Sequence, residues 1–157
     1  MRRIALISLL VLAALAVFAI VRYPGKAPAA GGCNADLWTH VYRPKRLRIL
    51  TPCTIIEGRV HDVGREADGD LHLGVIPDDA SVLNLANVMH GGGRLVVEAV
   101  CDHASTLPDV TAACAGYTSA IAAPAVGDRI RATGVYVKDR ENGWNEIHPL
   151  SRIETLR

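Results

Sequence analysis

Aromatic residues are scarce in this chain. Its 157 residues include one Phe, two Trp and four Tyr. Proteins that bind single-stranded nucleic acid stack successive bases on aromatic side chains. With so few of them, the composition argues against an extended stacking surface, and a single tryptophan is better explained by packing.

Two catalytic or metal-binding motifs are also missing. The chain has no C-x-x-C pair, so a zinc site built from cysteines is not expected. It has no G-x-S-x-G either, which excludes the nucleophile elbow of the α/β-hydrolases. At 157 residues it is also too short for that fold.

The chain has no excess of basic charge once its N-terminal segment is set aside. It contains 17 Lys and Arg against 16 Asp and Glu, and four of the basic residues precede Cys33. Thirteen basic residues therefore remain against 16 acidic ones, which leaves a net charge of −3. Such a domain lacks the positive field that drives sequence-independent binding to nucleic acid.

One long apolar run is present, at 4–21, and Met1-Arg2-Arg3 precedes it. Its length suffices to cross a membrane, which takes roughly 20 residues with tolerance to about 17. We predict that residues 1–22 form a single-pass signal anchor in the cytoplasmic membrane, that 23–34 form a linker, and that 35–157 form a domain outside the cytoplasm. The alternative is a signal peptide cleaved after Ala29 or Ala30, which would leave the domain secreted or periplasmic.

Export gives the four cysteines a structural role. Cys33, Cys53, Cys101 and Cys114 are even in number and would lie where disulfides are permitted. Three pairings are possible. We favour Cys33 with Cys53 and Cys101 with Cys114, because each pair closes a short loop, and four buried free thiols are the alternative.

Hydrophobic alternation and turn residues predict five strands and three short helical segments. The first segment is 36–42, with Asp36 as its cap, and the basic cluster that follows at 43–48 is predicted to be a solvated turn. Gly58 suggests a bulge or a sharp bend of a barrel in the first strand. The predicted strands are 54–63, 70–76, 94–100, 129–137 and 144–153, and the further helices are 78–89 and 106–115.

This order of elements resembles the OB-fold, a five-stranded Greek-key barrel. We predict an all-β domain with two or three short helices, arranged as an OB-fold-like barrel behind an N-terminal transmembrane or signal helix. The strands would pair in the order one, two, three, five, four, with a helix between the third and fourth. A β-sandwich is the alternative, although five strands are few for it.

Several stretches carry a more specific resemblance. They are LWTHVY at 37–42, DGDLH at 68–72, LVVE at 95–98 and GWNEIHP at 143–149. In these the chain resembles a family of small bacterial extracytoplasmic OB-fold-like domains of unknown function, over nearly all of 33–154. The resemblance implies the fold and the location, and it carries no activity.

Strand alternation gathers a polar set on one outer face. Residues i and i+2 of a strand share a face, so inward Leu71, Val97 and Ile147 turn their neighbours outward. The third strand would lie between the second and the fifth. The predicted ligand-binding or metal-binding residues are therefore Asp70, His72, Glu98, Trp144, Glu146 and His148.

These residues favour an OB-like binding or interaction module whose partner is a polar ligand or a protein, held on the outer face of the second, third and fifth strands. One alternative is a divalent-metal-dependent hydrolase in which His72 and His148 bind the ion and Glu146 or Glu98 assists. Another is a single-stranded nucleic-acid binder, by fold analogy alone. A further possibility is that these side chains only solvate an exposed strand face, and one bulge would move any of them to the other side.

Overall fold

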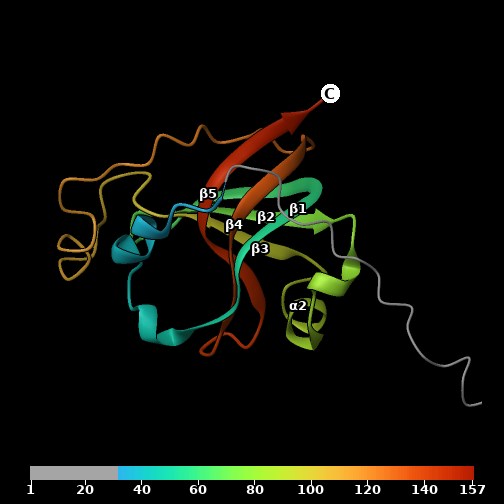
Figure 1. Cartoon of the computed structure of the whole chain (residues 1–157), viewed down its shortest axis with the longest axis horizontal. Helices are drawn as coiled ribbons and strands as arrows, with labels where there is room; N and C mark the ends of the chain where they lie inside the picture. Colours follow the sequence, from blue (N-terminus) through green and yellow to red (C-terminus); the bar gives the residue numbers. More distant parts are fainter. Residues whose placement is uncertain (1–31) are drawn as a thin grey trace, which may run out of the picture.

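A computed structural model describes residues 32–157. The predicted anchor at 1–22, with its apolar run at 4–21, and most of the linker predicted at 23–34 lie outside the described residues. Within 32–157, no helix has the length and apolar character needed to cross a membrane. This part of the chain is mostly β, with a five-stranded mixed sheet and a few short helices (Figure 1).

All five predicted strands are present in one sheet. Their bounds are β1 (Leu47–Arg65), β2 (Leu71–Pro77), β3 (Leu95–Ala99), β4 (Arg129–Asp139) and β5 (Asn145–Leu156). The predicted order is confirmed: the strands lie side by side as β1, β2, β3, β5, β4, and β1 pairs with both β2 and β4, so the sheet closes on itself. Every pairing is antiparallel except that of β3 with β5, which is parallel.

The first strand is much longer than predicted. It runs for 19 residues, pairs with β4 along most of its length, and pairs with β2 in its second half. The register with β2 shifts between Val60 and Asp62, and the register with β4 shifts between Ile49 and Thr54, so the bulge suggested at Gly58 is not there. Gly58 instead lies tightly against β2, where an added Cβ would come within 2.8 Å of Val75 Cγ1. Bulges bend a strand, which lets one strand serve both sides of the closed sheet.

The helices are shorter than predicted, and the first begins at another cap. The first, η1 (Ala35–His40), is capped by Asn34, whose side chain accepts a hydrogen bond from the Asp36 N–H at 3.0 Å, so the prediction of Asp36 as cap is wrong. The helix predicted at 78–89 is two elements, η3 (Ala80–Val82) and α2 (Leu85–Met89). It divides because Asn84 is extended and forms a capping box that starts α2 afresh.

The prediction of a helix at 106–115, between β3 and β4, is wrong. This stretch consists of turns, in which Val110 donates to the Leu107 carbonyl and Ala113 donates to the Val110 carbonyl. The disulfide between Cys101 and Cys114 holds the two Cα atoms 5.6 Å apart. The chain between them therefore doubles back, whereas the predicted ten-residue helix would extend for about 15 Å.

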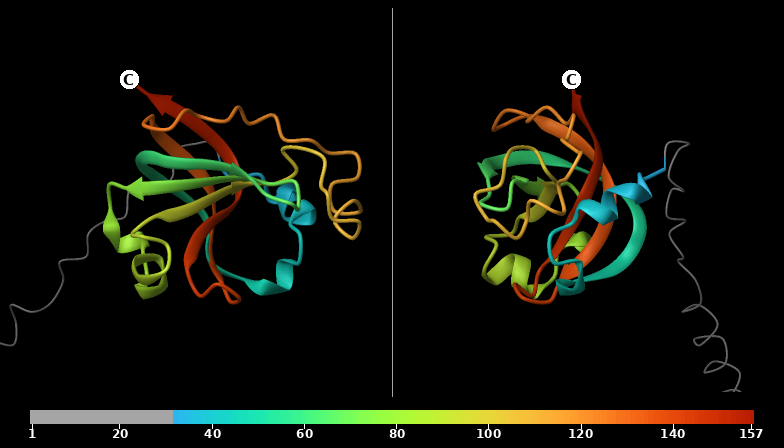
Figure 2. Two further views of the ribbon diagram at one scale, coloured as in Figure 1. Left: turned by 180° about the vertical axis from the view of Figure 1, so that it is seen from behind. Right: turned by 90° about the vertical axis from the view of Figure 1, so that its left-hand side faces the viewer.

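Two apolar clusters lie on opposite sides of the sheet. The inner one fills the closed sheet and includes Leu73, Val97 and Ile147. The outer one joins Leu37 of η1 to Val100 and Val137. Figure 2 shows η1 and the segment after β3 close together, and the His40 Nδ1 lies 2.7 Å from the Ala113 carbonyl oxygen. The N-terminal segment and the loop after β3 therefore cover part of the outer face of the sheet.

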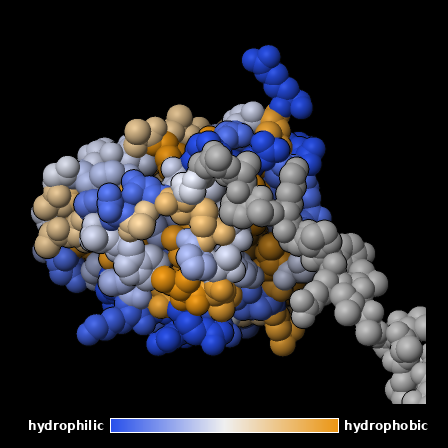
Figure 3. Space-filling model, viewed as in Figure 1, coloured by the Kyte–Doolittle hydropathy of each residue, from blue (hydrophilic) through white to orange (hydrophobic). Residues whose placement is uncertain are grey.

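The helix α2 is attached by hydrogen bonds rather than by apolar packing. Leu85, Val88 and Met89 are more than half exposed, and Figure 3 shows apolar residues at the surface near α2. Asn87 is the buried member, and its amide donates to the carbonyls of Arg94 and Asn145 at 3.0 and 2.9 Å.

Both predicted disulfides are present. Cys33 bonds to Cys53 across 20 residues of sequence, and Cys101 bonds to Cys114 across 13. Two disulfides in one small domain fit an oxidising, extracytoplasmic location.

Removing the second disulfide should weaken the fold. We expect the pair of substitutions Cys101→Ser and Cys114→Ser to lower the free energy of unfolding by about 3 kcal/mol, because the reduced chain regains the entropy of a 13-residue loop. Urea unfolding measures the loss. Alkylation of the unreduced native protein should find no reactive thiol, and four would contradict both bonds.

The packing of Gly134 gives a second test. An added Cβ there would lie 2.6 Å from the Pro149 carbonyl oxygen and would also overlap the Ile147 side chain. We expect Gly134→Ala to lower the free energy of unfolding by about 1–3 kcal/mol through overpacking. Gly64→Ala is the matched control, since its Cβ would meet only the Glu66 carboxylate at 3.8 Å. Equal effects in urea unfolding would contradict the packing argument.

Candidate functional site

The six predicted residues come together on the outer side of β2, β3 and β5. His72 pairs with Glu98 across β2 and β3, and Glu146 lies opposite Val96 across β3 and β5. The predicted exposure is wrong, because Glu98 is 9% exposed and Glu146 and His148 are 0% exposed. The cluster is a buried charged layer, since η1 and the loop after β3 cover this part of the face.

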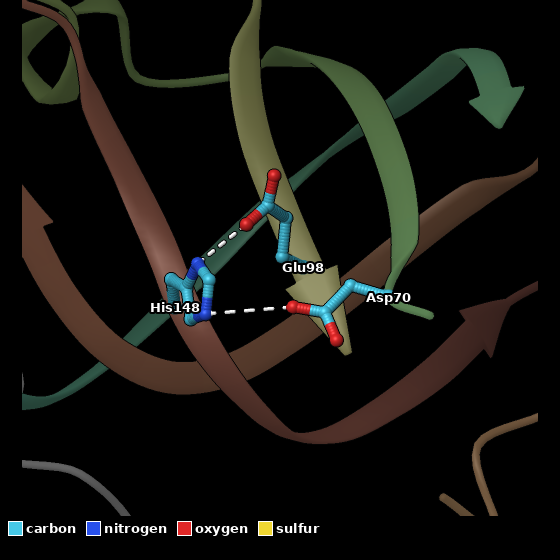
Figure 4. A group of neighbouring side chains, drawn as sticks. All are labelled: Asp70, Glu98 and His148. Atoms are coloured by element: carbon cyan, nitrogen blue, oxygen red, sulfur yellow. Dashed lines mark ion pairs between the residues drawn. The ribbon is translucent and has the colours of Figure 1, made fainter. Parts of the chain in front are cut away.

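His148 lies at the centre of this layer. Figure 4 shows its ring between two carboxylates, Glu98 on one side and Asp70 on the other. Its Nδ1 contacts Glu98 Oε2 and lies 3.3 Å from Glu146 Oε1, while its Nε2 lies 3.7 Å from Asp70 Oδ2. The imidazole is therefore surrounded by three acidic side chains.

Glu98 links both histidines of the site. Its Oε1 lies 3.1 Å from His72 Nδ1, and its Oε2 contacts His148. The two imidazoles therefore bracket one carboxylate. Among the described residues, the group placed to hold a metal ion is Asp70, Glu98 and His148, rather than the histidine pair predicted for a hydrolase.

The acidic surroundings control the protonation of the histidines. Burial lowers the pKa of His148, but the charge of Glu98 and the contacts with both glutamates outweigh it and raise this pKa to about 10. Burial likewise opposes the raised pKa of His72, which results from its hydrogen bond to Glu98. Burial alone would raise the pKa of Glu98, but His148 and His72 have the larger effect and hold this pKa below its usual value.

The charged form of Asp70 is disfavoured by burial. Burial raises its pKa to about 7, although His148 and a backbone hydrogen bond act in the opposite direction. That bond comes from the Cys101 N–H, which donates to Oδ1 at 2.8 Å. The other oxygen, Oδ2, is buried and has no hydrogen-bond partner within the described structure.

The sequence prediction missed Arg46. The cluster at 43–48 was predicted to be solvated, but the side chain of Arg46 is only 13% exposed, and it contacts Asp139 and lies 3.7 Å from Glu98. Arg43 has a left-handed backbone, and Pro44 starts the short helix η2 (Pro44–Arg46), which brings Arg46 to the site. No periodicity distinguishes Arg46 from the other basic residues of this turn.

Asp139 is a second residue that the prediction missed. It ends β4, is fully buried, and accepts hydrogen bonds from the N–H groups of Glu141 and Asn142 at 2.6 and 3.0 Å. Aspartate commonly closes turns in this way, so its position before the loop at 140–143 was a signal for a turn. The contact with Arg46 had no signal in the sequence.

Trp144 is fixed by the same layer. Its Nε1 donates to Glu146 Oε2 at 2.9 Å. The remaining oxygen of Glu146, Oε1, is buried without a hydrogen-bond partner in the described structure. The indole ring therefore has a set orientation above the buried charges.

A cavity of about 390 Å³ opens above this layer. Its size lies in the range of small-molecule sites. Its floor includes His72 and Glu98, and Trp144 forms part of its wall. The complete lining is Tyr42, Arg43, Arg46, Glu66, Ala67, Asp68, His72, Glu98, Leu107, Glu141, Asn142 and Trp144.

Comparison with known proteins does not identify this site. No protein-family model matches the chain, and no curated protein is significantly similar to it.

Arg46 should be much more important for stability than Arg43. We expect Arg46→Met to lower the free energy of unfolding by about 3–5 kcal/mol, because it leaves buried carboxylates without their guanidinium. Arg43→Met is the matched control: Arg43 pairs with Glu141 at 2.7 Å, but both side chains are about half exposed. Such exposed pairs contribute at most about 1 kcal/mol. Similar losses in urea unfolding would show that Arg46 does not compensate a buried charge.

Proposed function

We propose that this chain is an extracytoplasmic binding module that holds a small polar ligand in the cavity above β2 and β3. The domain would be an OB-fold-like barrel, attached to the membrane by residues 1–22 or released by their cleavage. It would belong with the small bacterial domains of unknown function that it resembles. The closed five-strand order and the two disulfides support this assignment.

The cavity itself is the observation that carries the proposal. It lies on the side of β2 and β3 where OB-folds bind ligands, and His72, Glu98 and Trp144 line it together. Each of these side chains is held in place by another group of the layer beneath. A cavity lined by oriented polar side chains and by aromatic rings is typical of a preformed ligand site.

The charges of the lining favour a cationic ligand. The two guanidiniums are already compensated, since Arg43 pairs with Glu141 and Arg46 pairs with Asp139. The lining also contains the carboxylates of Glu66 and Asp68, which pair with neither arginine, and the aromatic face of Trp144 offers a cation–π contact. We therefore favour a small ligand that carries an amine over a phosphate or a nucleic acid.

Fluorescence of Trp144 tests this function. The chain has two tryptophans, so Trp38→Phe leaves Trp144 as the only reporter. We expect a saturable change when the intact protein is titrated with spermidine or a glucosamine trimer. Smaller effects are expected from the uncharged N-acetylated trimer and from a single-stranded oligonucleotide.

Glu66→Gln provides the matched comparison, since Glu66 lines the cavity and is about half exposed. It should weaken the amine response several-fold without loss of thermal stability. Silence of Trp144 towards every probe would reject a small-ligand site and leave a protein partner as the remaining function.

A further inference from the structure

Two buried polar atoms face each other across the centre of the site. Asp70 Oδ2 and His148 Nε2 are 3.7 Å apart, and neither has a hydrogen-bond partner in the described structure (Figure 4). Asp70 is 3% exposed and His148 is 0% exposed. A buried polar atom without a hydrogen-bond partner lowers the stability of a protein. A third group that bonds to both atoms would remove this loss.

The separation distinguishes between three such groups. A proton shared directly by a charged pair would hold the two atoms about 2.7–2.9 Å apart. A water molecule bonded to both atoms at about 2.8 Å, with a tetrahedral angle, would hold them about 4.6 Å apart. A metal ion bonded to both at about 2.1 Å with tetrahedral geometry gives about 3.4 Å. The observed 3.7 Å is closest to the ion.

Glu98 completes a set of three ligands. The ligand atoms of Asp70, Glu98 and His148 all lie within 4.8 Å of one another, and all three residues are buried. One imidazole and two carboxylates suit Zn²⁺, and three protein ligands leave one position open. Glu98 also lines the cavity, so an ion at this site would be close to that opening.

Glu146 is placed to orient the histidine. Its Oε1 lies 3.3 Å from His148 Nδ1 and has no hydrogen-bond partner, while its Oε2 accepts from Trp144. A metal-bound histidine usually donates its second N–H to a carboxylate, which fixes the ring. Glu146 can therefore accept a hydrogen bond from the Nδ1–H of His148 when Glu98 turns to the ion.

The charge of the layer also favours a cation. Its buried carboxylates belong to Asp70, Glu98, Glu146 and Asp139, and its buried guanidinium belongs to Arg46. Four carboxylates and one permanent cation leave the layer short of positive charge unless its histidines are protonated, and a bound ion would supply that charge in their place.

We propose that Asp70, Glu98 and His148 bind one divalent cation of the zinc type, with Glu146 as a positioning residue. The ion binds His148 through Nε2, so this nitrogen carries no proton in the bound form. The site shares Glu98 with the cavity above it, but the amine-binding function does not require the ion.

Calorimetry with the metal alone tests the site. ZnCl₂ should bind the intact protein with one-to-one stoichiometry, and Asp70→Asn should weaken binding at least tenfold while it keeps the oxygen that accepts from Cys101. The matched control is Asp78→Asn, which removes a half-exposed carboxylate that pairs with Arg129 and should change the affinity less than twofold. Absence of binding to the wild type at millimolar zinc overturns the proposal, and so does equal weakening in the two variants.

A measurement on the wild type keeps the test valid if Asp70→Asn does not fold. In the ¹⁵N spectrum of labelled histidines, zinc should shift the Nε2 resonance of one ring and leave that ring protonated only on Nδ1. His148 is identified as the ring that does not exchange rapidly with solvent. Stoichiometric zinc binding that leaves the Nε2 resonance of this ring unchanged overturns the proposal.

Discussion

The contact between Glu98 and His148 is the interaction on which the rest of this structure's polar interior depends. Both side chains are buried, and a buried charge is tolerated only when it is paired and hydrogen-bonded. The same Glu98 carboxylate also holds His72, and Arg46 lies 3.7 Å from it. The loss of one member would leave the others uncompensated, so these groups must be present as a set.

The closed sheet makes this set possible. β3 is only five residues long, but it lies between β2 and β5 and so brings residues from three strands to one place. η1 and the disulfide-linked loop after β3 then cover the face and remove water from it. Removal of water strengthens the interactions between the charges and increases the cost of leaving one unpaired. The cavity lies where this cover ends, and Glu98, His72 and Arg46 connect the buried layer to its floor.

Periodicity predicted much of this arrangement, because a strand that packs one face on a core must alternate. Leu71, Leu73 and Val97 are fully buried inside the sheet, and that orientation directs His72 and Glu98 to the opposite side. The strand order then placed Glu146 and His148 beside them. Alternation reports which side a residue faces, and it does not report what covers that side. For this reason the six residues were predicted correctly as neighbours, but four of them, Asp70, Glu98, Glu146 and His148, were predicted wrongly as exposed.

The sequence by itself determined the five strands and the apolar face of each, because these follow from local alternation. The strand order, and with it the six polar neighbours, was predicted from the resemblance to the OB-fold, and the disulfide pairs were favoured among three possibilities because each closes a short loop. Only the tertiary structure decided that the polar face is buried, that Arg46 compensates it, and that residues 106–115 form turns. Each of these depends on segments far apart in the chain: Arg46 meets Asp139 across 93 residues. Such contacts leave no periodic trace in the sequence, since they arise only after the sheet has closed and the covering segments have packed on it.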